Sequence, residues 1–270
     1  MKKGKATITC IANNKGGVGK TTTAINLAAG LKLLGNKVLL IDLDPQGNCA
    51  YGLGIEPYED VFTIGDVFCG QCTLDGAIIS TKYTDLIPNN LYSYRKISPR
   101  TNHNRLAFFL GQNPQVLDFY DHIIIDTPPS IEIMTLNAAY ASDIFLLVTE
   151  YSKFSMIGIK ILMEVLDDIG GNEIKSKLQT IPRPILFTMY DSRVRLSKLV
   201  EQNIEESKTG LILAEKISRT VRIQESFFEA VPAVCRANNP AGKGYKELAL
   251  KWHEARNTGI LHGKTQNIKI

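Results

Sequence analysis

The residues best suited to chemistry in this 270-residue chain lie in one glycine-rich string, Asn14-Lys15-Gly16-Gly17-Val18-Gly19-Lys20-Thr21-Thr22. An apolar stretch precedes the string and a helix-forming stretch follows it, which is the context that a phosphate-binding loop requires. Glycines let backbone N–H groups approach phosphate oxygens, and the following helix adds the positive end of its dipole. In such a loop Lys20 reaches the β- and γ-phosphates, and the Thr21 hydroxyl binds Mg²⁺. The string therefore predicts a nucleoside triphosphate site. The usual spacing would put glycine at position 14, and Lys15 is an additional lysine inside the loop.

Two further strings place aspartates at the ends of apolar stretches. Asp42 and Asp44 stand at the end of the first apolar stretch, and Asp126 directly follows the second stretch, residues 122–125. Alternation along a strand puts Asp42 and Asp44 on the same face, at the edge where α/β sheets bind ligands. A carboxylate buried at the end of an apolar strand needs a cation, which Mg²⁺ provides at Asp126. The alternative for Asp42 and Asp44 is that they cap the following helix.

The K-G-G-x-G-K-T-T form of the loop, a deviant Walker A motif, and the D-T-P-P sequence at 126–129 resemble those of the ParA/Soj/MinD class of ATPases. The resemblance covers most of the chain and implies ATP and Mg²⁺ as cofactors. The phosphate-binding residues that it implies are Lys15, Gly16, Gly17, Val18, Gly19, Lys20, Thr21 and Thr22. It also implies that Lys15 reaches across a nucleotide-sandwiched homodimer to the partner's phosphates, while Asp44 orients the attacking water. Thr21, Asp42 and Asp126 would hold Mg²⁺, the aspartates through water.

Two segments in the last third resemble DNA-binding segments of partition ATPases. Residues 188–196 resemble the family's T-M-Y-D-x-R segment, and residues 217–225 resemble its I-P-R-N-V-R-L-S-E segment. The resemblance implies that nonspecific binding to double-stranded DNA, through bidentate contacts to phosphate, falls to Arg193, Arg219 and Arg222, with Arg195 and Lys198 beside them. The basic excess of the chain, whose net charge is +4, lies wholly in residues 188–270, which carry 14 basic and 9 acidic side chains. The alternative is a set of solvated surface arginines.

Three positions depart from the family's pattern. Ser218 stands where the family has proline, and residues 226–230 (S-F-F-E-A) replace a stretch similar to A-P-S-H-G. Glu150 stands where many relatives have glutamine. These departures concern the adenine side of the site and the DNA surface, and they leave the phosphate chemistry as expected.

The elements that must position these residues are short apolar stretches alternating with helix-forming ones. The apolar stretches lack the strict polar alternation of half-exposed strands, which is typical of strands buried on both faces of a parallel sheet. The predicted strands are Thr7–Ala12, Val38–Asp42, Asp85–Pro88, His122–Asp126, Asp143–Val148 and Ile185–Tyr190, and the predicted helices are Thr21–Leu34, Asn104–Leu110, Ile131–Ala141, Met156–Asp168, Leu196–Ser207 and Lys243–Asn257. This alternation predicts an α/β fold, a doubly wound, mostly parallel sheet with helices on both faces. We expect a single P-loop ATPase domain over residues 1–257, a flexible tail at 258–270, and the least regular structure at 55–105.

The resemblance favours a ParA-type ATPase that partitions DNA, either a plasmid or a chromosome region. ATP binding would join two subunits, only that homodimer would hold DNA, and hydrolysis stimulated by a ParB-type centromere-binding partner would release it. Because the first strand is expected to start near Thr7, no room is left for an N-terminal DNA-binding domain, as in the short Soj-like branch. The alternatives are a membrane-associated spatial regulator of the MinD kind and a metal-cluster carrier of the same superfamily.

The composition of the chain also argues against membrane-spanning and secreted proteins. No apolar run reaches the roughly 18 residues of a membrane span, and the basic N-terminus is not followed by a secretory signal. Five cysteines, an odd and sparse number, favour a reducing compartment. We therefore expect a cytoplasmic protein without a membrane partner, associated with the nucleoid when ATP is bound. Cys69 and Cys72 have metal-ligand spacing but no second pair, so they do not predict a zinc site. Trp252 is expected to be a packing anchor.

Overall fold

The computed structural model describes residues 5–56, 60–97, 102–130, 132–152, 157–159, 161–162, 164–165, 180–191, 193 and 211–258. These residues form one eight-stranded sheet in the order β3-β4-β2-β5-β1-β6-β7-β8. The strands are β1 (Thr7–Ala12), β2 (Val38–Asp42), β3 (Ile79–Ser80), β4 (Asp85–Ile87), β5 (His122–Asp126), β6 (Ile144–Glu150), β7 (Pro184–Tyr190) and β8 (Leu211–Ser218). Neighbouring strands run parallel except β3, which is antiparallel to β4 at the edge. The predicted mostly parallel α/β sheet is confirmed.

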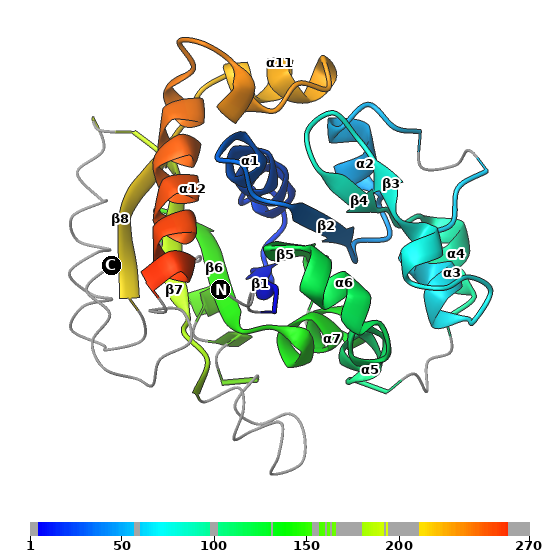
Figure 1. Cartoon of the computed structure of the whole chain (residues 1–270). Helices are drawn as coiled ribbons and strands as arrows, with labels where there is room; N and C mark the ends of the chain where they lie inside the picture. The colour runs from blue at the N-terminus through cyan, green and yellow to red at the C-terminus, as the bar shows by residue number, and fades with distance from the viewer. Residues whose placement is uncertain are drawn as a thin grey trace.

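Helices cover both faces of this sheet, as Figure 1 shows. The helices are α1 (Lys20–Leu33), α2 (Asn48–Gly52), α3 (Ile64–Phe68), α4 (Leu91–Arg95), α5 (Arg105–Gln112), α6 (Pro114–Phe119), α7 (Ile133–Ala141), α11 (Arg222–Phe228) and α12 (Pro240–Thr258), with single 3₁₀ turns η1 (Asp75–Ala77) and η2 (Ala233–Cys235). One face packs on α1, α2, η2 and α12, and the other packs on α3, α5, α6 and α7. Of the helices in the described part of the chain, none is long and apolar enough to cross a membrane.

Alternation along the buried strands creates these two cores. In β1, Ile8 and Cys10 belong to the core beneath α5–α7, whereas Ile11 belongs to the core beneath α1 and α12. The largest buried side chain on the α12 side is Trp252, which is 2% exposed and donates from Nε1 to the Thr9 hydroxyl (3.1 Å). Trp252 is thus a packing anchor, as expected, and it fixes α12 against the middle of the sheet.

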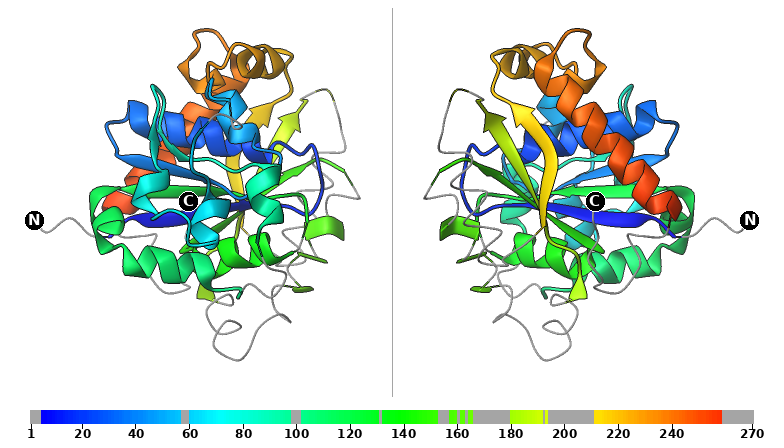
Figure 2. Two further views of the ribbon diagram at one scale, coloured as in Figure 1. Left: turned by 90° about the vertical axis from the view of Figure 1, so that its right-hand side faces the viewer. Right: turned by 90° about the vertical axis from the view of Figure 1, so that its left-hand side faces the viewer.

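Register brings the chemistry-bearing residues to one edge of the sheet. β1, the dark-blue strand of Figure 2, lies between β5 and β6, and β5 lies between β1 and β2. The last residues of β2 and β5, Asp42 and Asp126, are direct register partners. Because parallel strands end at the same edge, the loops that follow β1, β2 and β5 meet there. The three predicted motifs are therefore neighbours in space.

Several elements differ from the sequence prediction. Within the predicted irregular segment 55–105, β4 matches the predicted strand Asp85–Pro88 apart from its last residue, whereas α3, α4 and β3 were not predicted, and neither β8 nor α11 was predicted. The predicted helix 156–168 is helical at its described residues, 157–159, 161–162 and 164–165, whereas the predicted helix 196–207 lies outside the described residues. The closing helix starts three residues earlier than predicted, at Pro240, and reaches Thr258, and residues 259–270 of the predicted tail lie outside the described residues.

The end of α11 takes a conformation that normally calls for glycine. Ala230 has φ of 50°, in the left-handed region. Its N–H donates to the carbonyl of Phe227 (3.1 Å), and the N–H of Val231 donates to the carbonyl of Ser226 (2.9 Å). This pair of bonds is a Schellman motif with alanine at the position where glycine is preferred. The related stretch of the family, A-P-S-H-G, ends in glycine at this place.

Ala230→Gly is therefore expected to stabilise the protein by about 0.5–1 kcal/mol. The left-handed conformation costs a non-glycine residue about 1–2 kcal/mol, which exceeds the roughly 0.5–1 kcal/mol of extra backbone entropy that glycine loses on folding. Thermal unfolding should show a rise in Tm of roughly 1–4 °C. Ala107→Gly within α5 is the matched control and should lower Tm. A fall in Tm for both variants would contradict the strain assigned to Ala230.

Candidate nucleotide-binding site

The glycine-rich string forms the loop between β1 and α1. Asn13 anchors its start: the side-chain Nδ2 donates to the carbonyl of Val148 in β6 (2.7 Å), and Oδ1 accepts from the N–H of Lys15 (2.9 Å). Gly17 and Gly19 have φ of 76° and 90°, values that side chains disfavour. A Cβ atom at Gly17 would meet nothing within 4 Å, so the backbone conformation, not lack of space, requires glycine there. The loop thus has the conformation of an anion-binding turn at the N-terminus of a helix.

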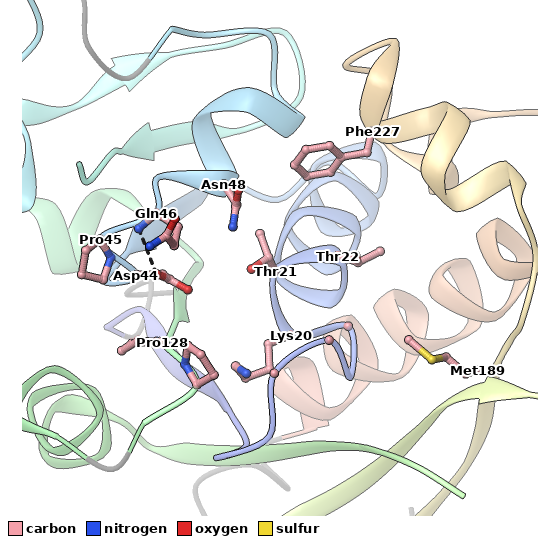
Figure 3. A pocket seen from close by; sticks show the side chains of 14 residues that line it. Lys20, Thr21, Thr22, Asp44, Pro45, Gln46, Asn48, Pro128, Met189 and Phe227 are labelled. Atoms are coloured by element: carbon pink, nitrogen blue, oxygen red, sulfur yellow. Dashed lines mark hydrogen bonds between the residues drawn. The ribbon is translucent and has the colours of Figure 1, made fainter. Parts of the chain in front are cut away.

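A cavity of about 620 Å³ lies above this loop (Figure 3). Its lining residues are Gly16, Gly17, Gly19, Lys20, Thr21 and Thr22, then Asp44, Pro45, Gln46 and Asn48 after β2, Pro128 and Pro129 after β5, and Met189 and Phe227. Lys20 and Thr21 at the start of α1 and Asp44 after β2 converge on it. Six of the eight predicted phosphate-binding residues therefore line the cavity, and Lys15 and Val18 do not. The side chain of Val18 is buried, and its carbonyl accepts from the Thr188 hydroxyl (2.7 Å).

The two lysines of the loop have different surroundings. Lys20 is 7% exposed, and its Nζ donates to the carbonyl of Lys15 (3.0 Å). Burial lowers the pKa of Lys20, and the charges of Asp126 and Asp44 oppose that shift. Lys15 is half-exposed, and its ammonium pairs with the carboxylate of Glu150 at the end of β6. Within one subunit Lys15 thus contacts its own chain and leaves the phosphate cavity to Lys20.

Beneath the cavity lie two fully buried carboxylates, Asp42 and Asp126. Asp42 accepts from the N–H groups of Asp44 (2.9 Å) and Cys49 (3.1 Å). Asp126 Oδ2 accepts from the Thr21 hydroxyl (2.7 Å), while Oδ1 has no hydrogen-bond partner. Burial raises the pKa of Asp126 to about 7 and, together with the charge of Asp126, raises the pKa of Asp42 well above its usual range. Both shifts reflect buried negative charge that a bound cation would offset.

Asp44, unlike Asp42 and Asp126, lines the cavity itself. It is only 7% exposed and accepts from the N–H of Gln46 through Oδ1 (2.9 Å). That bond fixes the carboxylate at the side of the cavity opposite α1 (Figure 3). A carboxylate held there has the reach and the acceptor atoms to orient a water molecule beside a bound phosphate.

A second pocket, of about 300 Å³, adjoins the first and shares Gly19, Thr22 and Met189 with it. Its other lining residues are Thr188, Ile217, Ser218, Arg219, Thr220, Val221, Ile223, Gln224 and Tyr245. Apolar walls with a few polar groups are typical of a site for a nucleotide base. Met189, at the junction of the two pockets, has φ of 52°, a strained value of the kind that clusters at ligand sites. Sequence reasoning assigned no role at the nucleotide to Met189 or Tyr245, because only folding brings them to the loop.

Of the five predicted DNA-binding residues, the structure describes Arg193, Arg219 and Arg222. Arg193 is exposed at the end of β7 and pairs with Asp191 (2.6 Å), and hydrogen bonds from Arg193 hold the pKa of Asp191 down at about 2. Arg219 follows β8, borders the base pocket, and donates from its N–H to the carbonyl of Tyr190. Arg222 begins α11 and hydrogen-bonds the carbonyl of Asn238. The adjacent strands β7 and β8 thus bring Arg193 and Arg219 to the same edge of the sheet. Arg195 and Lys198 lie outside the described residues.

The residues present fit a nucleoside triphosphate with Mg²⁺. Among the described residues, one cluster of three metal-ligating side chains, Asp42, Cys49 and Asp126, brings its ligand atoms within 4.8 Å of one another. The unpartnered Oδ1 of Asp126 and the adjacent Thr21 hydroxyl are oxygen donors of the kind that Mg²⁺ prefers. Cys69 and Cys72 belong to no such cluster in this part of the chain.

Comparison with known proteins shows the family of this chain. A family model described as an AAA domain matches residues 6–180. The chromosome partitioning protein ParA of Caulobacter vibrioides (strain NA1000 / CB15N) is 34% identical over 230 residues, which cover 81% of this chain and 83% of that protein. The chromosome-partitioning ATPase Soj of Treponema pallidum (strain Nichols) is 34% identical over 245 residues, which cover 88% and 93%.

Solved structures agree with the fold. A candidate plasmid partition protein from Borrelia burgdorferi B31, bound to AMPPNP, superposes with a TM-score of 0.71 and 27% identity, covering 93% of this chain and 99% of that one. The cobyrinic acid a,c-diamide synthase of Mycobacterium smegmatis, with a bound ATP analogue and magnesium, shares the fold at a TM-score of 0.76 and 24% identity, covering 94% and 97%. The matched domain and the identity to ParA and Soj over most of both chains show that this protein belongs to the ParA/MinD-type P-loop ATPases.

Proposed function

We propose that this protein is a Mg²⁺-dependent ATPase that partitions DNA, either a plasmid or a chromosome region. The observation that carries the proposal is the convergence of Lys20, Thr21 and Asp44 on one cavity above Asp126, beside a pocket suited to a base. The AMPPNP bound to the Borrelia protein supports ATP as the nucleotide. The names of the relatives ParA and Soj support partition as the role.

The loop and the acidic residues around the cavity would have separate parts in hydrolysis. The loop N–H groups and Lys20 would hold the β- and γ-phosphates, while Thr21 directly, and Asp42 and Asp126 through water, would hold Mg²⁺. When bound, Mg²⁺ neutralises charge on the phosphates. Asp44 keeps a carboxylate oxygen available to orient the attacking water, since its other oxygen accepts from Gln46.

The site is completed by a second copy of the chain. Lys15 points toward Glu150 of its own subunit, so in the proposed dimer it leaves that partner and reaches the neighbouring triphosphate. Surface ion pairs contribute only about 0–1 kcal/mol, so breaking this one costs little. A cation supplied in trans to a phosphoryl transition state is worth about 10³–10⁵ in rate. Breaking the Lys15–Glu150 pair would therefore cost far less than the transition-state stabilisation that Lys15 would supply at the partner's site.

DNA binding would belong to that ATP-bound dimer. Arg193 and Arg219 lie at the edge of the sheet that carries the nucleotide site, and Arg222 follows on α11. A dimer would align these arginines from both subunits on one surface, and a ParB-type partner would stimulate hydrolysis and so release the DNA. The ATP-bound form would then reside on the nucleoid in the cytoplasm.

The parent protein should bind nonspecific double-stranded DNA when ATP is present. It should not bind DNA with ADP or without nucleotide. With four phosphate contacts per subunit, the log–log dependence of affinity on salt should have a slope of about −7. The double variant Arg219→Ala with Arg222→Ala should lose DNA retention while it still dimerises on ATP. Filter binding at several salt concentrations and light scattering measure the two properties.

The matched control for this prediction is Lys243→Ala with Lys246→Ala, which removes the same charge from the exposed face of α12. The control should retain DNA with a nearly unchanged salt slope. Equal loss in both double variants would mean that charge in general, and not the predicted surface, binds DNA. Binding of the ATP form to anionic vesicles in place of DNA would favour the alternative, a membrane-associated regulator of the MinD kind.

A further inference from the structure

One sulfur atom lies at the centre of the carboxylate cluster described above. Cys49 is the second residue of the short helix α2, a few residues after Asp42 and Asp44. Its side chain is fully buried, and its Sγ lies 3.5 Å from Oδ2 of Asp126. Its backbone N–H donates to Oδ2 of Asp42 (3.1 Å). The ligand atoms of Asp42, Cys49 and Asp126 thus form one compact group, within 4.8 Å of one another.

This group has an acceptor that nothing in the described protein satisfies. Oδ1 of Asp126 is buried and has no hydrogen-bond partner, although the other oxygen of the same carboxylate accepts from Thr21 and Cys49. The nearby ammonium of Lys20 donates to the carbonyl of Lys15. A buried carboxylate oxygen without a donor is costly, and a cation at this point would offset the cost.

We propose that Asp42, Cys49 and Asp126 form a site for a thiophilic divalent cation, Zn²⁺ or Cd²⁺, in the nucleotide-free protein. Thiolate and carboxylate ligands together favour these metals, whereas Mg²⁺ prefers oxygen ligands alone. Binding breaks the S–H bond of Cys49, forms a metal–sulfur bond, and releases one proton to solvent, with no change of oxidation state. The inference shares two carboxylates with the Mg²⁺ site of the proposed function, but it depends on Cys49 and not on DNA partition.

Because the two cations would share carboxylate ligands, they should compete for binding. Because Asp126 would serve both, Mg²⁺ with ATP should lower the occupancy of the thiophilic cation, and that cation should hinder binding of Mg²⁺ with ATP. Mg²⁺ alone should compete poorly, since it gains nothing from the sulfur. Cys49 therefore makes the nucleotide site of this chain sensitive to zinc and cadmium.

Cadmium titration of the full-length chain tests this proposal. The background carries Cys69→Ser, Cys72→Ser and Cys235→Ser, because these three partly exposed thiols would bind cadmium themselves. In this background one equivalent of Cd²⁺ per chain should produce the ultraviolet charge-transfer band of a cadmium–thiolate bond. Adding Cys49→Ala should abolish the band and weaken Cd²⁺ binding by about 100-fold or more, since loss of an outer-shell partner alone costs about 10–100-fold. Adding Cys10→Ala, which removes another buried thiol outside the cluster, should leave the band.

Either of two results would overturn the site: no band in the background protein, or a band that survives Cys49→Ala. Should Cys49→Ala fail to fold, cadmium NMR of the background protein decides instead. A resonance in the range of mixed sulfur and oxygen ligation supports the site, and a resonance in the all-oxygen range refutes it. Retention on DNA with ATP is measured in parallel, so that failure of this site and failure of the proposed function are told apart.

Discussion

Lys15→Gln is expected to lower ATP hydrolysis by about 10³-fold or more while the variant still binds ATP. Lys15 does not line the phosphate cavity of its own subunit, which Lys20, Thr21 and the loop glycines occupy, so nucleotide binding should persist. The lost rate reflects the missing trans cation at the leaving phosphoryl group. Phosphate release measures the rate, and light scattering with a nonhydrolysable analogue and Mg²⁺ measures dimer formation, which should also be lost.

Two control variants isolate the role of this amine. Lys243→Gln removes a lysine whose side chain is 81% exposed, and its rate should match the parent. Glu150→Gln removes only the intrasubunit partner of Lys15, a pair worth about 0–1 kcal/mol, so dimers should form at an ATP concentration at most about fivefold lower. If Lys15→Gln hydrolyses ATP at the parental rate, the role assigned to Lys15 is wrong. If Glu150→Gln loses about 10³-fold in hydrolysis rate, catalysis depends on the Lys15–Glu150 pair and not on Lys15 alone.

Strands buried on both faces were predictable from sequence almost to the residue. β1, β2 and β5 have the predicted bounds because every residue in them is buried, so the apolar run ends where the strand ends. β8 was missed because Glu215 and Lys216 interrupt its apolar pattern. The structure accommodates Glu215 through an ion pair with Lys251 of α12 (2.9 Å), a contact between residues far apart in sequence. β3 was missed because two residues carry no readable period.

The residues of the site likewise differ in how far the sequence predicts them. Its phosphate side follows from one contiguous string, so residue types and spacing were enough to predict Lys20, Thr21 and the loop glycines. The base pocket depends on Tyr245, whose hydroxyl hydrogen-bonds Thr23 across more than 200 residues (3.1 Å). The pair between Lys15 and Glu150 depends likewise on β1 and β6 being neighbours. Contacts of this kind arise from strand order, which no local pattern in the sequence specifies.

Asp44→Ala is expected to lower hydrolysis by about 10²–10⁴-fold while ATP-bound dimers persist and stay on DNA longer than the parent. The side chain lines the cavity, but its Oδ1 bond to Gln46 is local, and Thr21 and Asp126 remain to hold Mg²⁺. Single-turnover phosphate release and the DNA dissociation rate test the two effects. Asp75→Ala, on an exposed turn, is the control and should behave as the parent.

Mixing Asp44→Ala with Lys15→Gln chains then tests whether the lysine acts in trans. In a mixed dimer, the site of the Lys15→Gln subunit keeps its own Asp44 and receives Lys15 from the Asp44→Ala subunit. Each mixed dimer has one working site of two, so hydrolysis should return in the mixture, at up to half of the parental rate per mixed dimer. If Lys15 served its own subunit, every site would lack either the lysine or the aspartate, and the mixture would stay as inactive as its components.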